Sequence, residues 1–182
     1  MSRFSIPTRD EVSEGNRAIF DDLRKKLGMV PNLYAYYAKS ETALADYLAF
    51  QGRKTTLNAK EREVVNLVTS QINGCRYYQS AHTAVGKMTG FSDEEIIQLR
   101  GGTAPFDTKL DALARFVAEA VRRRGHVSEE IKEVFFDAGY TEENLIDVII
   151  NVGDKVISNF IHNVAEFTID FPVAPELETV TA

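Results

Sequence analysis

The sequence predicts an all-α protein, and three observations support that prediction. Helix-start signals recur along the whole chain, whereas strand signals do not. Glycine and proline residues stand at intervals that suit helices of roughly 10 to 20 residues. Between them, apolar residues recur with the three- and four-residue spacing of one helical face. We therefore expect about six or more helices.

The N-terminal part of the chain contains two helix starts and one helix stop. Thr8 precedes Glu11 by three residues, which is the spacing of a capping box. Gly28 with Pro31 marks the end of a helix, because glycine takes the left-handed cap conformation and proline cannot continue the helix. Ser40, which is followed by an acidic residue, marks the next start.

The segment 59–72 is predicted to be an amphipathic helix. Asn58 and Glu61 form a second capping-box pattern at its start. Its apolar positions recur at helical spacing and are Val64, Val65, Leu67, Val68 and Ile72. We expect this helix to bury one face. The dipeptide Asn73-Gly74 then interrupts the pattern, and residues 75–87 read as a new helix that stops before Gly90.

Two further helices are predicted before residue 126. The first begins at the capping-box pattern of Ser92 and Glu95 and ends at the pair Gly101-Gly102. The second buries a face made of Leu110, Leu113, Ala114, Val117 and Val121. The basic run 122–124 fits the C-terminus of that helix, where cations complement the helix dipole.

The last helices begin at Ser128 and Thr141. Residues 145–167 are apolar on nearly two faces, so this helix has to be covered from both sides, by its own domain and by a second subunit. After residue 171 the chain has little to pack. We expect one helical domain over residues 1–171 and a mobile tail over residues 172–182.

Composition excludes several classes of protein. The 182 residues, 44% of them hydrophobic, are enough for a core without metal or disulfide support. A net charge of −6 argues against nucleic-acid binding, because a phosphate backbone requires clustered Lys and Arg. No segment has the apolar length of a membrane span, and the first residues lack the apolar region of a signal peptide, so we expect a cytoplasmic protein.

The segment 73–82 holds most of the chemically distinctive residues. Cys75 is the only cysteine of the chain, which rules out an intrachain disulfide. In the first turn of a helix, a thiol feels the positive end of the helix dipole, which lowers its pKa. The alternative is that Cys75 is a small hydrophobic residue of the core.

Helical geometry places Cys75, Tyr78 and His82 on one face, because offsets of three and seven residues fall within an arc of about 60°. His82 stands one turn after Tyr78, whereas Cys75 lies about 10 Å away along the axis. His82 is therefore expected to serve position 78 more directly than position 75. From the residues alone, a structural role for either His82 or Tyr78 stays open.

The sequence resembles the alkylhydroperoxidase AhpD-like and carboxymuconolactone decarboxylase family. The family motif has a Glu, then twelve residues later the first Cys of Cys-x-x-Cys, then a His four residues after the second Cys. Glu63, Cys75, Tyr78 and His82 stand at those spacings, and residues 28–34 are similar to the N-terminal region of the longer peroxidase-related members. The resemblance implies an AhpD-like helical bundle that assembles into homo-oligomers.

In family members that reduce peroxides, the Cys beside the His attacks the peroxide, the Glu and His relay protons, and the other Cys resolves the sulfenic acid. Here Tyr78 occupies the attacking position, and no second thiol exists. A phenol with a pKa near 10 is not a peroxide-reducing nucleophile. The resemblance therefore implies a peroxidase whose activity is weak or lost, with Cys75 in the resolving position.

Three interpretations stay open. The first is an alkylhydroperoxidase-like oxidoreductase that acts on a peroxide through Cys75 with an external thiol reductant. The second is a lyase like the carboxymuconolactone decarboxylases, which acts on a lactone acid and has Glu63, His82 and Arg76 available for acid–base chemistry and carboxylate binding. The third is a non-enzymatic helical assembly or binding protein. No metal or other cofactor is expected, because the three histidines are far apart in sequence.

Overall fold

The structure is a computed structural model that describes residues 4–177, and these residues form helices and no strand. The all-α prediction is therefore confirmed. The chain divides into two compact units, which are described in turn: Met1–Lys54 with Ile161–Asp170, and Thr55–Phe160 with Phe171–Ala182, as far as these residues are described. None of the helices within residues 4–177 has the length and apolar character needed to cross a membrane.

The first unit contains a 3-10 turn and three helices, η1 (Arg9–Glu11), α1 (Glu14–Leu27), α2 (Asn32–Tyr37) and α3 (Ala43–Gln51). The Thr8 capping box nucleates only η1, and α1 begins at Ser13, whose hydroxyl accepts a bond from the Asn16 amide. The buried side-chain amide of Asn16 donates through Nδ2 to the carbonyls of Ala38 and Ser40, which ties α1 to the segment that follows α2.

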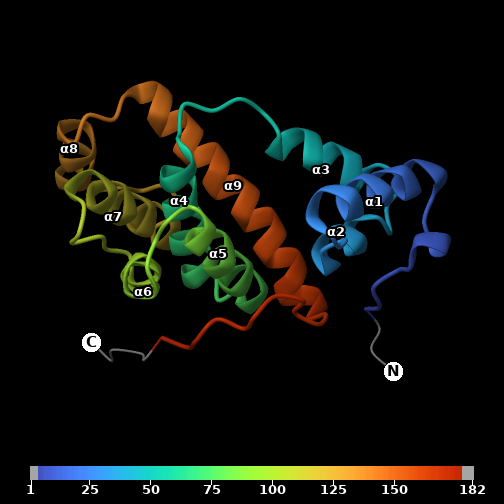
Figure 1. The fold of residues 1–182 in the computed structure, drawn as a ribbon. Coiled ribbons are helices and arrows are strands. Elements are labelled where there is room, and N and C mark those ends of the chain that lie inside the picture. Colours follow the sequence, from blue (N-terminus) through green and yellow to red (C-terminus); the bar gives the residue numbers. More distant parts are fainter. Residues whose placement is uncertain (1–3, 178–182) are drawn as a thin grey trace. The chain divides into compact units, whose positions relative to one another are not determined.

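The second unit contains α4 (Ala59–Ile72), α5 (Arg76–Met88), α6 (Asp93–Gly101), α7 (Thr108–Arg122), α8 (Glu129–Asp137) and most of α9 (Glu142–Ala165) (Figure 1). The predicted capping boxes at Asn58 and Ser92 are both present. The start of α7 at Asp107, whose carboxylate accepts from two backbone amides, has no counterpart among the predicted starts.

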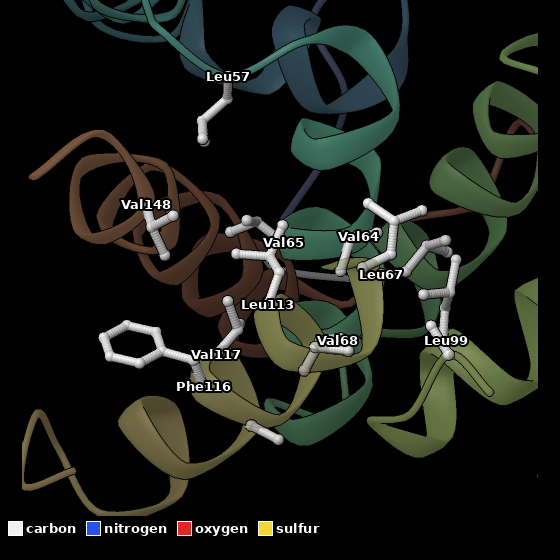
Figure 2. Packing of buried hydrophobic residues seen from close by; sticks show 14 of the residues in the cluster. Leu57, Val64, Val65, Leu67, Val68, Leu99, Leu113, Phe116, Val117 and Val148 are labelled. Carbon is white, nitrogen blue, oxygen red and sulfur yellow. The ribbon is translucent and has the colours of Figure 1, made fainter. Parts of the chain in front are cut away.

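Helix α4 lies at the centre of the second unit and packs against α5, α6 and α7. Its apolar residues share a core with Leu113 and Val117 of α7 and Val148 of α9 (Figure 2). Each fully buried Val or Leu side chain stabilises the fold by about 1.5–3 kcal/mol. The prediction that α4 buries one face was too narrow, because the polar residues Glu61, Glu63, Asn66, Thr69 and Ser70 are also buried.

The C-terminal segment, residues 171–177, runs along α5 in an extended form (Figure 1). Its Ala174 is buried, donates its amide to Ser80 Oγ at 3.0 Å and accepts at its carbonyl from Arg76 Nη2 at 2.8 Å. The chain therefore packs at least as far as Ala174. The division into a domain of residues 1–171 and a mobile tail stays a prediction, and residues 178–182 of that tail lie outside the described residues.

Candidate active site

The turn between α4 and α5 brings Glu63 and His82 together. Gly74 adopts a φ of 65°, in the left-handed region that favours glycine, and the Cys75 amide then donates to the Ser70 carbonyl at 3.0 Å. The reversal lays α5 back against α4. Glu63 from the second turn of α4 thus meets His82 from the second turn of α5, which is the pairing that the family spacing implies.

The Glu63 carboxylate is almost fully buried and accepts two hydrogen bonds. Its Oε2 lies 2.8 Å from His82 Nδ1, and its Oε1 accepts from Asn66 Nδ2 at 2.8 Å. Burial by itself raises the pKa of Glu63, but its interaction with His82, the hydrogen bond from Asn66 and the charge of Lys155 outweigh this effect, so the pKa is lowered. Glu63 is therefore a carboxylate at neutral pH.

Lys155 of α9 completes the cluster from the other side of the imidazole. Its Nζ lies 3.4 Å from His82 Nε2, 3.2 Å from Asp154 Oδ2 and 4.3 Å from the centroid of the Tyr78 ring. The side chain is only 3% exposed. A lysine so deeply buried requires charged or π partners, and it has both here.

These contacts assign the histidine tautomer. An ammonium group has donors and no acceptor, so Lys155 donates to His82 Nε2. His82 Nδ1 then carries the proton and donates it to Glu63. The chain of bonds continues behind Glu63, where Asn151 Nδ2 donates to Asn66 Oδ1 at 2.9 Å. His82 therefore stands between a proton donor and a carboxylate.

Tyr78 forms one wall of this cluster. Its ring stacks on the His82 imidazole, with centroids 5.1 Å apart and planes 21° from parallel. The expectation that His82 serves position 78 more directly than position 75 agrees with this contact. Tyr78 is thus in contact with both His82 and Lys155.

The position of Cys75 and the pKa of its thiol both differ from what the sequence predicts. Cys75 is the residue that precedes α5 and not a residue of the first turn, and it is fully buried. Burial raises the pKa of its thiol, and this effect exceeds the opposing effects of the Tyr78 and Tyr77 amides, the Asn159 side chain and the Lys155 charge. The predicted lowering of the thiol pKa was therefore wrong, because desolvation outweighs the favourable amides at the helix start.

Arg76 lies outside this cluster. Its guanidinium donates to Gln79 Oε1 and to the Ala174 carbonyl. Lys155 was missed as a site residue because it is 73 residues from His82 in sequence. The available signal was the one lysine within the largely apolar segment 145–167. Within residues 4–177, His, Cys, Asp and Glu side chains form no group of three or more that could hold a metal ion.

Residues 37–118 match the family model described as the carboxymuconolactone decarboxylase family. The match covers 82 of the 182 residues. The matched segment contains Glu63, Cys75, Tyr78 and His82, whereas Lys155 follows it. The resemblance that the motif spacing predicts is therefore confirmed.

Solved structures share the fold over nearly the whole chain. An uncharacterized peroxidase-related protein from Silicibacter sp. TM1040 is 24% identical, with a TM-score of 0.81 over 92% of this chain and 91% of that one. A peroxidase-related protein with an alkylhydroperoxidase AhpD core, from Ralstonia eutropha JMP134, is 21% identical, with a TM-score of 0.83 over 93% and 92%. The predicted AhpD-like fold is thus confirmed.

The debrominase Bmp8, solved as a Cys-to-Ala variant in complex with 2,3,4-tribromopyrrole, is 14% identical, with a TM-score of 0.76 over 93% of this chain and 92% of that one. At these identities the likenesses establish the fold of this chain and not its chemistry. No curated protein matches the chain.

Proposed function

We propose that this protein is an acid–base lyase of the carboxymuconolactone decarboxylase type, which removes a carboxylate from a small conjugated lactone acid. The observation that carries the proposal is the buried chain Lys155–His82–Glu63, in which the imidazole contacts an ammonium at 3.4 Å and a carboxylate at 2.8 Å. Such a chain holds and moves a proton without the need for a thiol.

The reaction balances with these groups. The bond between the substrate carbon and its carboxylate breaks, CO₂ leaves, and the electron pair stays on the carbon, from which it delocalises onto the conjugated carbonyl oxygen. The Lys155 ammonium stabilises the negative charge on that oxygen. His82 takes a proton from Lys155 and delivers it to the carbon, while Glu63 stabilises the imidazolium that forms in between. A proton from the solvent then restores the Lys155 ammonium. One proton is consumed for each CO₂ released.

Thiol-dependent peroxide reduction, the first activity that the resemblance implies, has less support. It requires an accessible thiolate, whereas the Cys75 thiol is fully buried and its pKa is raised. The position that contacts His82 holds the phenol of Tyr78, and Cys75 is the only cysteine of the chain. We expect peroxidase activity of the unmodified protein to be weak or absent.

The test compares two activities across matched variants. The purified protein is incubated with a panel of unsaturated lactone acids, including a carboxymuconolactone, and CO₂ release is measured. The same preparation is assayed with an organic hydroperoxide and a dithiol. His82→Ala and Lys155→Met should each lower decarboxylation by about 10²–10⁴-fold, the usual effect of losing an acid–base group. Cys75→Ser should leave decarboxylation within about twofold of the unmodified protein.

Lys87→Met is the control for Lys155→Met, because Lys87 is about half-exposed and pairs only at the surface with Asp93. Lys87→Met should leave the rate of CO₂ release unchanged. Peroxide reduction that disappears in Cys75→Ser, with no CO₂ release from any lactone acid, would favour the oxidoreductase over the lyase. Inertness towards both substrate classes would leave a non-enzymatic assembly or binding role.

A further inference from the structure

Arg100 of α6 is a buried charge that the proposed function does not use. The residue is only 2% exposed, and in the described residues its guanidinium bonds only to neutral amide oxygens, through Nε to Gln71 Oε1 at 2.9 Å and Nη2 to Gln79 Oε1 at 3.3 Å. Its Nη1 is buried with no hydrogen-bond partner. A buried guanidinium without a counter-ion is costly, so this arrangement requires an explanation.

A second guanidinium makes the arrangement less favourable. Arg76 Nη1 donates to the same oxygen, Gln79 Oε1, at 2.9 Å, so the two positive groups are neighbours that share one neutral acceptor. Burial, and next the like charge of Arg76, lower the pKa of Arg100. Glu176 is the carboxylate that pairs with Arg76 in the described residues; its Oε1 lies 4.0 Å from Arg76 Nη2, and its side chain is 87% exposed.

We propose that Arg76 and Arg100, together with Gln79, form a binding site for a small oxyanion, a phosphate or carboxylate group, beneath the C-terminal segment. The two guanidiniums offer several N–H donors to one ligand, which is the pattern that recognises such groups. An anion there would neutralise the pair and give Arg100 Nη1 its missing partner.

The C-terminal segment closes the site. Ala174 bonds to Ser80 Oγ through its amide and to Arg76 Nη2 through its carbonyl, and Glu176 follows it. Two hydrogen bonds are a weak closure, worth about 1 kcal/mol each. Entry of an anion therefore displaces the exposed Glu176 carboxylate and lifts this short segment from Arg76.

This site goes beyond the proposed lyase and does not depend on it. Arg76 projects about 120° around α5 from His82, at about 100° per residue. Arg76 donates hydrogen bonds to Gln79 and to the C-terminal segment, whereas His82 is hydrogen-bonded to residues of α4 and α9. The bound oxyanion would belong to a second ligand, with the His82 cluster left open.

The test follows thermal unfolding of the full chain with inorganic phosphate or succinate, at an ionic strength held constant with sodium chloride. A ligand at ten times its Kd should raise Tm by about 3–6 °C. Arg76→Gln and Arg100→Met should abolish the shift. Glu176→Gln should increase affinity, because it removes the competing carboxylate, and Arg115→Gln, a charge removal on α7 outside the pair, should change nothing.

Arg76 is partly exposed, so Arg76→Gln keeps the test valid if Arg100→Met does not fold. A shift with phosphate alone assigns a phosphate group, and a shift with succinate alone assigns a carboxylate. No shift with either ligand, or an equal shift in Arg76→Gln and the unmodified chain, would overturn the proposal. The partial negative charge at the C-terminus of α6 and the oxygens of Gln71 and Gln79 would then compensate the charge of Arg100.

Discussion

At the scale of single residues, the chemistry of the site depends on which side chains are desolvated. Glu63 and Cys75 are both buried, yet the pKa of the carboxyl is lowered and that of the thiol is raised. The difference comes from the strength of their partners. Glu63 accepts from an imidazole and an amide at 2.8 Å each, whereas the interactions of the Cys75 thiol are too weak to offset its burial.

The first residue-scale prediction concerns thiol reactivity. Because Cys75 is fully buried and its pKa is raised, iodoacetamide at neutral pH should alkylate it more slowly in the folded protein than it alkylates free cysteine. Mass spectrometry over a time course measures the rate, and the unfolded chain in denaturant provides the control and should react readily. Alkylation faster than that of free cysteine would contradict this prediction and would support the lowered thiol pKa that the helix start led us to expect.

The second concerns position 78. Tyr78→Cys restores Cys-x-x-Cys beside His82, and residues three apart at a helix start bring their Cα atoms to about 5–6 Å, within disulfide reach. We expect a disulfide with Cys75 and a gain of dithiol-dependent hydroperoxide reduction. His82→Ala in that background should remove most of the gain, about 10²–10⁴-fold. Tyr78→Ser is the matched control without a thiol, and a disulfide-bonded variant with no peroxidase activity would contradict the prediction.

The third concerns pH. The pKa of Glu63 is lower in the folded protein than its ordinary value, so this group stabilises the fold above the unfolded pKa, and the stabilisation is lost as pH falls through the folded pKa. Glu63→Gln should therefore lower the free energy of unfolding at pH 7 more than at pH 3. Urea denaturation at both pH values measures this, with Glu129→Gln, on an exposed carboxylate, as the control. An equal decrease in the free energy of unfolding at both pH values would show that ionisation of Glu63 does not contribute to stability.

At the scale of elements, helix ends decide how closely α6 and α7 approach. Gly102 caps α6 with a φ of 90°, and a Cβ built there would lie 3.2 Å from Ala118 Cβ of α7. A side chain would therefore meet two costs at once, a strained backbone and a clash. The neighbouring Gly101 lies within α6 and has open space around its Cβ position.

This contrast predicts opposite effects for neighbouring substitutions. Gly102→Ala should destabilise the protein by about 1–3 kcal/mol, whereas Gly101→Ala should be neutral or stabilise it by up to about 1 kcal/mol. Chemical denaturation of the two variants measures the free energies of unfolding. Equal effects would mean that α7 shifts to accommodate the added methyl group.

At the scale of the whole molecule, the part of α9 in the second unit carries an exposed apolar face. Ile146, Ile149, Ile157 and Phe160 are each at least 41% exposed on the described surface. Their spacing makes one continuous stripe along the helix. Such a stripe is costly in water, so we propose that a second copy of this chain covers it, as expected from the two apolar faces of this segment.

The expected assembly is a homo-oligomer with an interface above about 1,000 Å². Light scattering at micromolar concentration should give a mass above 20.4 kDa for the unmodified chain and a shift towards 20.4 kDa for Ile157→Lys. Met88→Lys is the matched control, since Met88 is 85% exposed on α5 and lies outside the stripe. A monomeric unmodified chain would refute the assembly.

The sequence by itself determined the helical class and the helix starts at Asn58 and Ser92, whereas the pairing of Glu63 with His82 was implied only by the resemblance to the family motif. The helical class and the helix starts could be read from the chain for a physical reason. These features depend on local rules, in which side chains cap nearby amides and helical periodicity assigns residues to faces. The same rules predicted that position 78 would neighbour His82, as the stacked rings show.

Only the tertiary structure decided the place of Lys155 and the state of Cys75. Lys155 reaches His82 because α9 packs beside α5, and no periodicity links residues 73 positions apart. The helix start at Cys75 was read correctly to within one residue, but the pKa of its thiol follows from how completely its neighbours exclude water. Desolvation is a property of the packed interior, so it becomes visible only when the helices are assembled.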